Sequence, residues 1–371
     1  MARNRRKRAL ICSLSIVLIC ALVVSGIVWQ WVNTLSKQIM NDDFAANKVH
    51  VNSGTLPMTD RYITIALFGA DSREGELVAG TRTDAIIVLS IKKDTGAVKL
   101  LSVDRDTLIE LQVGTQKEYK QAGVAYYLGG PEGGISMLNQ TLDLAITDYV
   151  TVNFEGLSTI IDALGGVTLT VDEAEKDFIN THIFDTGTWA AVADEKPEFL
   201  YETGVVQATG KQAMAYSRNR FTPFTKTDGT QVLAGIARTE RQRVVLKQML
   251  SKIKEAKLSD VLRVAERVKK SETPIISTSL SRIEILDILK LYKKLQVGES
   301  TLFPAEREEA DIVQCGFSVI PVDLKSSVVQ AHNYLYDEES YQVSSEVVKL
   351  QEKLSEIFKQ HSYRRPDVLQ R

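Results

Sequence analysis

Two aspartates stand at the ends of neighbouring apolar runs. Asp71 follows residues 62–70, and Asp84 immediately precedes residues 85–91. Both runs are rich in Ile, Leu, Val and Phe, which is typical of buried strands. If the two strands pair as a hairpin, the carboxylates meet at one edge of a sheet. Close carboxylates repel unless they are protonated or bridged by a cation, and an oxygen-only ligand set favours Mg²⁺ or a similar hard ion.

Arginines stand near these and other apolar runs. Arg73 and Arg82 lie in the loop between the aspartates, so each aspartate could instead cap a turn or pair with one of them. Arg105 follows the run 98–103, and Arg218 and Arg220 are two residues apart. Helical spacing puts three further side chains on one face of a helix, namely Arg238, Arg241 and Gln242. Arginine donates paired hydrogen bonds to phosphate. The simpler alternative for each arginine alone is a surface salt bridge.

The elements that must position these residues alternate along the chain. Apolar runs at 62–70, 85–92 and 98–103 predict strands, and a glycine-rich piece predicts a turn and then a helix beginning near Pro131 or Gly134. Further strand and helix patterns alternate to about residue 171. Residues 172–206 show no clear strand or helix pattern, and helical periodicity dominates after Gly210. This order predicts a three-layer α/β/α domain with a mixed sheet over residues 61–360, in which 260–360 is mostly helical.

The N-terminus predicts a membrane anchor. Basic residues in 1–8 precede residues 9–32, which carry no charge and are long enough to span a bilayer. The positive-inside rule places residues 1–8 in the cytoplasm and the bulk of the chain outside. A cleaved signal peptide is the alternative. Residues 33–60 are predicted to be a stalk, and residues 361–371 a tail.

Composition excludes several other classes of function. The formal net charge of −2 gives no basic field for nucleic acid. The 3 cysteines have no metal-site spacing, and the 4 histidines are scattered.

Five ordered sequence blocks resemble the LytR-CpsA-Psr family over roughly residues 63–250. They are "LFGADSR" followed by "RTDAIIVLSI", "VKLLSVDRDT", the glycine-rich block from "AYYLGGPEGG" to "GGVTLTV", "ATGKQAMAYSRNR" and "IARTERQRVVLKQML". Ordered blocks are a specific signal, unlike a lone motif. The resemblance implies a phosphotransferase of the Gram-positive cell membrane. It would attach a glycopolymer, such as teichoic acid or capsule, from an undecaprenyl-pyrophosphate carrier to peptidoglycan.

The resemblance also implies roles for the residues singled out above. Asp71 and Asp84 match the aspartates that hold Mg²⁺, or Mn²⁺, against the pyrophosphate. The predicted catalytic arginines that grip the phosphates are Arg105, Arg218, Arg220 and Arg238. Nearby support for the pyrophosphate is expected from Arg73, Arg82, Arg241, Gln242 and, by a match displaced by one position, Lys120.

This chain departs from the family pattern in its proton-handling part. Family members often carry an aspartate, as a candidate base, three residues before the arginine that matches Arg238, but this chain has Gly235 there. Asp228 is the nearest upstream acid and is the candidate base, unless another group takes the proton. An extra acid, Asp104, also lies beside Arg105.

Two alternative functions stay open, and the missing aspartate before Arg238 suggests the first of them. The chain could be a non-catalytic scaffold or sensor that binds polyprenyl pyrophosphate, or a lipid pyrophosphatase in which water replaces the acceptor. Transcriptional control is disfavoured, because the predicted cytoplasmic part is too short to read DNA.

Overall fold

The computed structural model describes residues 39–363 except 42, 73–76, 184–197, 227, 272 and 314. No helix among these residues has both the length and the apolar character needed to span a membrane. The predicted cytoplasmic segment 1–8 and transmembrane helix 9–32 lie outside the described residues, as do residues 33–38, Arg73 and residues 364–371.

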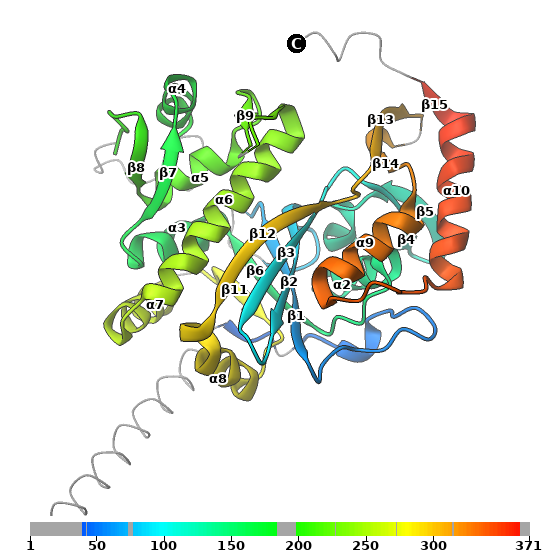
Figure 1. The fold of residues 1–371 in the computed structure, drawn as a ribbon, viewed down its shortest axis with the longest axis horizontal. Helices are drawn as coiled ribbons and strands as arrows, with labels where there is room; N and C mark the ends of the chain where they lie inside the picture. Colours follow the sequence, from blue (N-terminus) through cyan, green and yellow to red (C-terminus); the bar gives the residue numbers. More distant parts are fainter. Residues whose placement is uncertain are drawn as a thin grey trace, which may run out of the picture.

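A six-stranded mixed sheet forms the centre of the domain, in the order β11-β6-β1-β2-β3-β12 (Figure 1). Its strands are β11 (Ile276–Thr278), β6 (Asp148–Asn153), β1 (Tyr62–Ala70), β2 (Thr83–Lys92), β3 (Ala97–Val103) and β12 (Gln296–Phe303). β1 is parallel to β6 and β3 is parallel to β12, whereas β2 is antiparallel to both β1 and β3. The carboxyl ends of four strands therefore share one edge with the start of β2.

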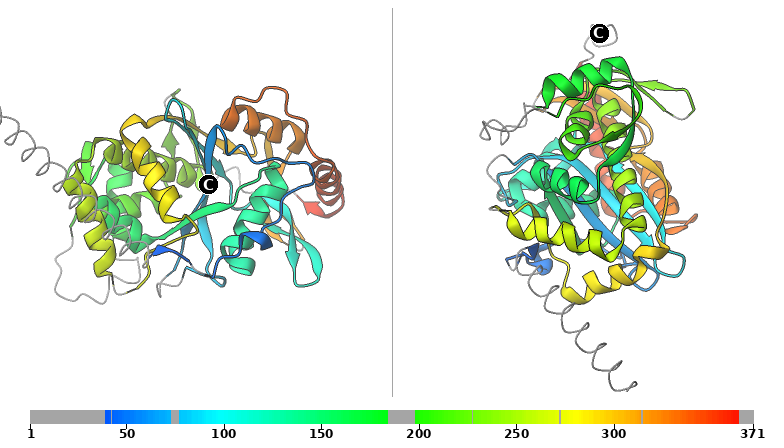
Figure 2. Two further views of the ribbon diagram at one scale, coloured as in Figure 1. Left: turned by 90° about the horizontal axis from the view of Figure 1, so that it is seen from below. Right: turned by 90° about the vertical axis from the view of Figure 1, so that its left-hand side faces the viewer.

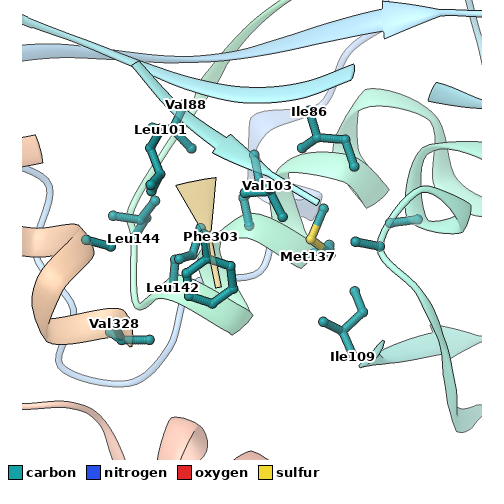
Figure 3. Packing of buried hydrophobic residues seen from close by; sticks show 14 of the residues in the cluster. Ile86, Val88, Leu101, Val103, Ile109, Met137, Leu142, Leu144, Phe303 and Val328 are labelled. Carbon is teal, nitrogen blue, oxygen red and sulfur yellow. The ribbon is translucent and has the colours of Figure 1, made fainter. Parts of the chain in front are cut away.

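Side chains alternate between the two faces of this sheet, as a strand buried on both sides requires. Ile86 and Val88 pack into one core cluster, whereas Ile87 and Leu89 pack into another. The first cluster is covered by α2 (Val124–Leu142), α9 (Leu324–Tyr336) and α10 (Ser345–His361). Figure 3 shows this packing, with Phe303 of β12 beside Leu142 of α2.

The opposite face of the sheet is covered by α6 (Ala234–Glu255) and α8 (Arg282–Leu291). Beyond them lies a lobe with its own apolar cluster, built by α3 (Phe154–Ala163), β7 (Val167–Val171), α4 (Glu173–His182), β8 (Gly204–Ala208) and α5 (Gly210–Arg218). The helix α7 (Leu258–Lys270) packs on α3. Figure 2 shows helices on both sides of the sheet, which confirms the predicted mixed α/β architecture.

The structure differs from the sequence prediction in two segments. Besides its helices, the segment 260–360 adds β11 and β12 to the central sheet and carries β13 (Arg307–Ile312) and β14 (Gly316–Pro321). The described part of the predicted stalk packs on the domain, where Phe44 lies against the core and Asn52 is buried. The remaining short elements are η1 (Ala46–Lys48), β4 (Leu108–Val113), β5 (Gln116–Gln121), β9 (Phe224–Thr225), β10 (Gln231–Val232), η3 (Tyr292–Lys294) and β15 (Ser362–Tyr363).

Candidate active site

The predicted aspartate hairpin is present at the carboxyl edge of the sheet. The backbone N–H of Asp71 donates to the carbonyl of Arg82 at 2.9 Å, which extends the pairing of β1 and β2 beyond the strands. The register shifts at this end, so that Gly69 faces Ala85 while Ala70 faces Thr83. Asp84 is thus the extra residue of a β-bulge, a feature that re-aims side chains near functional sites.

Arg105 joins this edge directly after β3. Its guanidinium forms an ion pair with the Asp84 carboxylate, and its Nε lies 3.6 Å from Oδ1 of Asp106. Its backbone carbonyl accepts from the N–H of Gly123, the residue before α2. A Cβ at Gly123 would come within 3.3 Å of the Arg105 backbone oxygen and of its Cβ. A close backbone approach therefore fixes Arg105 at the edge.

Arg238 approaches the same cluster from the first turns of α6. It is only 6 % exposed, and its Nε has no hydrogen-bond partner. Burial lowers its pKa, as does the nearby Arg105, whereas Asp84, Asp106 and Asp104 raise it. A buried guanidinium with an unfilled donor is costly, so this arrangement favours an added anion.

Arg218 approaches the edge from the neighbouring lobe, and Arg220 lies in the segment that follows α5. The guanidinium of Arg218, at the end of α5, lies 4.9 Å from the ring of Phe154. Phe154 directly follows β6, and β6 ends beside β1. Arg220 is exposed two residues further on, with its guanidinium 5.4 Å from the Phe221 ring. Arg105, Arg218 and Arg238 thus come from the end of β3, from α5 and from α6 to the carboxyl edge, where ligands bind in many open α/β sheets.

Arg241 has a different place from the one predicted for it. Its side chain is fully buried, and its Nε and Nη2 both donate to Oε1 of Glu175 of α4, at 2.9 and 2.7 Å. The segment after α5 accepts the other hydrogen bonds: Nη1 donates to the backbone oxygen of Asn219, and Nη2 also donates to the backbone oxygens of Thr222 and Pro223 and to the Thr222 hydroxyl. Arg241 therefore does not face a ligand; it positions the segment that carries Arg220.

Replacing Arg241 by methionine is expected to destabilise the protein by about 3–5 kcal/mol, because Glu175 would keep a buried, unpaired charge. Chemical denaturation of the full-length protein measures this loss. Lys247→Met on the same helix is the matched control, since Lys247 pairs at 3.2 Å with Glu299, whose side chain is 90 % exposed. The control should lose less than about 1 kcal/mol. Equal losses would contradict the positioning role.

The other predicted support residues lie further from the arginine cluster. Lys120 is on β5 and pairs with Glu118 at 2.9 Å. Arg82 is exposed in the loop before β2, and Gln242 is half-buried on α6 beside Arg241. None of these three has a described contact with Arg105 or Asp84 within the residues that the structure covers.

The candidate base Asp228 lies in the exposed turn between β9 and β10. Hydrogen bonds from the backbone and side chain of Thr230 lower its pKa, which makes it a weaker proton acceptor. Asp106 has the opposite character, because burial raises its pKa, an effect that Arg105 partly offsets. At Gly235, a Cβ would meet no atom within 4 Å, so an aspartate would fit there.

The donor set at this edge suits a hard divalent cation. Asp71 and Asp84 offer carboxylate oxygens only, and the described residues contain no group of three or more His, Cys, Asp or Glu side chains that could enclose a metal. Mg²⁺ commonly takes one or two carboxylates and completes its shell with phosphate oxygens and water. The two aspartates fit that pattern, with Arg105 as the present partner of Asp84.

A cavity of about 630 Å³ lies at the opposite edge of the sheet, near the start of β1. It shares four apolar residues with the layer between the sheet and helices α6 and α8, namely Ile63, Ile65, Leu280 and Ile288. The arginine cluster does not line it. The cavity thus adjoins the apolar layer between the sheet and helices α6 and α8.

Sequence reasoning missed two cations beyond the cluster, the buried Arg243 and the half-buried Arg307. Arg243 lies five residues after Arg238 on α6, and Arg307 begins β13. Arg243 could have been predicted, because it belongs to the same arginine-rich block as Arg238. Nothing in the local sequence around Arg307 indicates a functional role.

Comparisons with known proteins agree with this architecture. The model of the LytR_cpsA_psr family matches residues 27–319. A polyisoprenyl-teichoic acid–peptidoglycan teichoic acid transferase, TagU of Oceanobacillus iheyensis, is 29% identical over 55% of this chain and 55% of its own length. Protein gbs0355 of Streptococcus agalactiae aligns with a TM-score of 0.59 at 23% identity, over 79% of this chain and 93% of that one.

A structure of a LytR-CPS2A-psr family protein, YwtF (TagT), with bound octaprenyl pyrophosphate lipid aligns with a TM-score of 0.51 at 18% identity. The alignment covers 77% of this chain and 99% of that one. At such identities the likeness to solved structures establishes the fold. The chain spans just over half the length of the first curated relative, at 55%.

Proposed function

Because the chain belongs to the LytR-CpsA-Psr family, we propose that it is a phosphotransferase that moves a glycopolymer from a polyprenyl-pyrophosphate carrier to peptidoglycan. The observation that carries this proposal is the convergence of Asp84, Arg105 and the buried Arg238 at the carboxyl edge of the sheet. A diphosphate carries several negative charges, and phosphoryl transfer depends mainly on positioning and on electrostatic stabilisation. The relative TagU bears the name of such a transferase.

The proposed reaction forms one phosphodiester and breaks one anhydride bond. A sugar hydroxyl of the acceptor attacks the phosphorus that carries the polymer. The bond from this phosphorus to the oxygen of the lipid phosphate breaks, so polyprenyl phosphate leaves, and the hydroxyl proton passes to a carboxylate. Arg105 and Arg238 would bind the phosphate oxygens, with Arg218 and Arg220 alongside. Mg²⁺ held by Asp71 and Asp84 would neutralise charge on the leaving phosphate.

The carrier's hydrocarbon tail needs an apolar path from this edge. We assign it to the layer between the sheet and helices α6 and α8, which ends at the 630 Å³ cavity. A donor with a forty-carbon tail should then have a KM about tenfold or more below that of a ten-carbon donor, because each buried methylene contributes about 0.8 kcal/mol. Steady-state kinetics with the full-length protein in detergent measures this difference. KM values that do not depend on tail length would contradict the path.

Asp106 is the better-placed proton acceptor. Asp106→Asn is expected to lower kcat by about 10²–10⁴-fold, the range of general base catalysis. Activity of the wild type should fall as the pH drops through the raised pKa of Asp106, because the carboxylate is then protonated. Asp228→Asn, in the exposed turn, is the matched control and should stay close to wild type. A large loss in the control with little loss in Asp106→Asn would reverse the assignment.

The site is proposed to work at the outer face of the cell membrane, anchored by residues 9–32. The alternative functions remain a lipid-binding scaffold, which would bind donor and form no bond, and a lipid pyrophosphatase, which would release polyprenyl phosphate with no adduct. The Asp106 carboxylate, 3.6 Å from Nε of Arg105, gives the arginine cluster a group that could accept the hydroxyl proton, which a transferase needs and a scaffold does not.

A further inference from the structure

His332 and Glu338 present two hydrogen-bond acceptors to each other with no donor between them. His332, on α9, is 3 % exposed, and its Nε2 lies 2.9 Å from the backbone oxygen of Leu142. Burial lowers the pKa of His332 more than the Leu142 carbonyl and Glu338 raise it, so the ring is neutral at pH 7. Because a carbonyl oxygen can only accept, Nε2 carries the ring proton and Nδ1 has a free lone pair. Nδ1 is 3.5 Å from Oε2 of Glu338, and neither atom has a hydrogen-bond partner among the described residues.

Neighbouring rings hold the imidazole in this orientation. The Tyr341 ring stacks on it, with centroids 3.4 Å apart at an angle of 11°, and the Tyr336 ring meets it edge-on at 5.7 Å. The imidazole therefore cannot turn Nδ1 toward another donor without losing the bond to Leu142 and these ring contacts. A buried acceptor without a donor costs free energy, and one group with two hydrogens to donate would satisfy both facing acceptors.

Both residues line the 630 Å³ cavity, in the part beside α9. β1 passes along this cavity and divides its lining. Ile63 and Ile65 face the apolar layer under α8. The hydroxyls of Tyr62 and Thr64 instead reach Tyr336 of α9, at 2.8 Å from its backbone oxygen and 3.2 Å from its hydroxyl. The polar part of the cavity thus lies on the other face of the sheet from the layer that we assign to the carrier's tail.

Carboxylates dominate the charged lining of the cavity. Lys93 is the one Lys or Arg among the described residues that line it, against five acids, namely Asp143, Asp148, Glu284, Asp287 and Glu338. Backbone and hydroxyl donors already occupy Asp143, and Lys290 pairs with Asp287. The open oxygen is that of Glu338. This excess of negative charge favours a cation, and the described residues contain no group of three or more His, Cys, Asp or Glu side chains that could enclose a metal. An organic ammonium ion fits, because its N–H groups supply the missing donors.

We propose that the polar part of this cavity binds a small primary amine, whose ammonium group donates one hydrogen bond to Nδ1 of His332 and one to Oε2 of Glu338. A nitrogen about 2.9 Å from both acceptors can direct one N–H to each. Tyr62, Tyr341 and Leu144 also line the cavity and would cover the carbon atoms of the amine. The carboxylates disfavour an amine that carries a phosphate, so we assign the site to a free amine rather than to a lipid headgroup. The amine would bind at the opposite edge of the sheet from the arginine cluster.

The first test compares ligands that differ in charge and in N–H groups. Isothermal titration of the full-length protein should find one site for cyclohexylamine. Cyclohexanol keeps the shape without the charge, and cyclohexyltrimethylammonium keeps the charge without an N–H group. Both should bind at least about tenfold more weakly than the amine, because neither can donate two hydrogen bonds to the acceptor pair. Equal affinities, or no binding of the amine, would overturn the proposal and leave water as the donor.

Two further ligands separate the sources of the amine. Ethanolamine should bind more tightly than phosphoethanolamine, because the phosphate of the latter would face the carboxylates. Tighter binding of phosphoethanolamine would contradict the assignment to a free amine and would indicate a lipid headgroup.

Glu338→Gln tests the acceptor pair itself. The new amide can donate to Nδ1 of His332, so the variant supplies the missing donor and should bind cyclohexylamine about tenfold or more weakly than the wild type. Glu339→Gln is the matched control, because it removes the same charge one residue away, at an exposed position outside the cavity lining, and should bind like the wild type. Glu338→Ala repeats the test if the glutamine variant fails to fold. Unchanged amine binding in a folded Glu338 variant would overturn the proposal.

Discussion

Arg105→Ala is expected to reduce transfer by about 10³–10⁵-fold, the range known for arginines that stabilise phosphoryl transfer. Arg105 forms an ion pair with Asp84 and lies beside Asp106 and Arg238, so its loss removes charge from the centre of the cluster. Most of the effect should fall on kcat, because the arginine acts on charge that moves during the reaction. Single-turnover kinetics with a lipid-pyrophosphate donor measures the chemical step.

The control for this variant is Arg267→Ala, at an exposed position on α7. It should transfer at the wild-type rate. Arg105→Lys separates charge from geometry: it keeps the positive charge and loses the planar fork, so it should recover only part of the rate. A fully active Arg105→Ala variant would exclude Arg105 from the reaction.

Removal of both carboxylates that we propose as metal ligands is the second change with a large expected effect. Asp71→Ala combined with Asp84→Ala should abolish the Mg²⁺-dependent part of the activity, as should a chelator added to the wild type. The fold should persist, because Asp71 is exposed and Asp84 lies at a bulge rather than in the core. Circular dichroism checks the fold, and activity against Mg²⁺ concentration gives the dependence.

Asp94→Ala is the matched control for the metal pair. Asp94 is exposed in the turn between β2 and β3, at the other edge of the sheet, where its Oδ1 accepts from the N–H of Thr95 at 2.7 Å. Its loss should leave the Mg²⁺ dependence unchanged. If the double variant kept full, Mg²⁺-dependent transfer, the metal would have to bind elsewhere.

The part of the fold that local pattern controls could be predicted from the sequence. The hairpin of β1 and β2 follows from two apolar runs separated by a loop rich in polar residues and glycine, and its register brings Asp71 and Asp84 to one edge. The helix predicted near Pro131 also has a local cause. α2 breaks at Gly129 and Gly130, the latter at a φ of 61°, and proline then suits the first turn of the next part.

The rest depends on partners that are distant in sequence. Helical spacing correctly groups Arg238 and Arg241 on α6, yet it cannot tell that Glu175, from a segment that lacks a clear sequence pattern, fills the donors of Arg241. In the same way, β12 joins the central sheet beside β3 although nearly two hundred residues separate them, so its edge position could not be read from its own residues. Arg307 is placed beside Asp104 only by that pairing.

The most direct test of the central claim is to measure both products of one reaction by mass spectrometry. The full-length protein would receive a polyprenyl-pyrophosphate-linked glycan, Mg²⁺ and a peptidoglycan oligomer. The account predicts a glycan–phosphate adduct on the oligomer and an equal amount of polyprenyl phosphate, both lost in Arg105→Ala. Polyprenyl phosphate without the adduct, or bound donor with neither product, would contradict it.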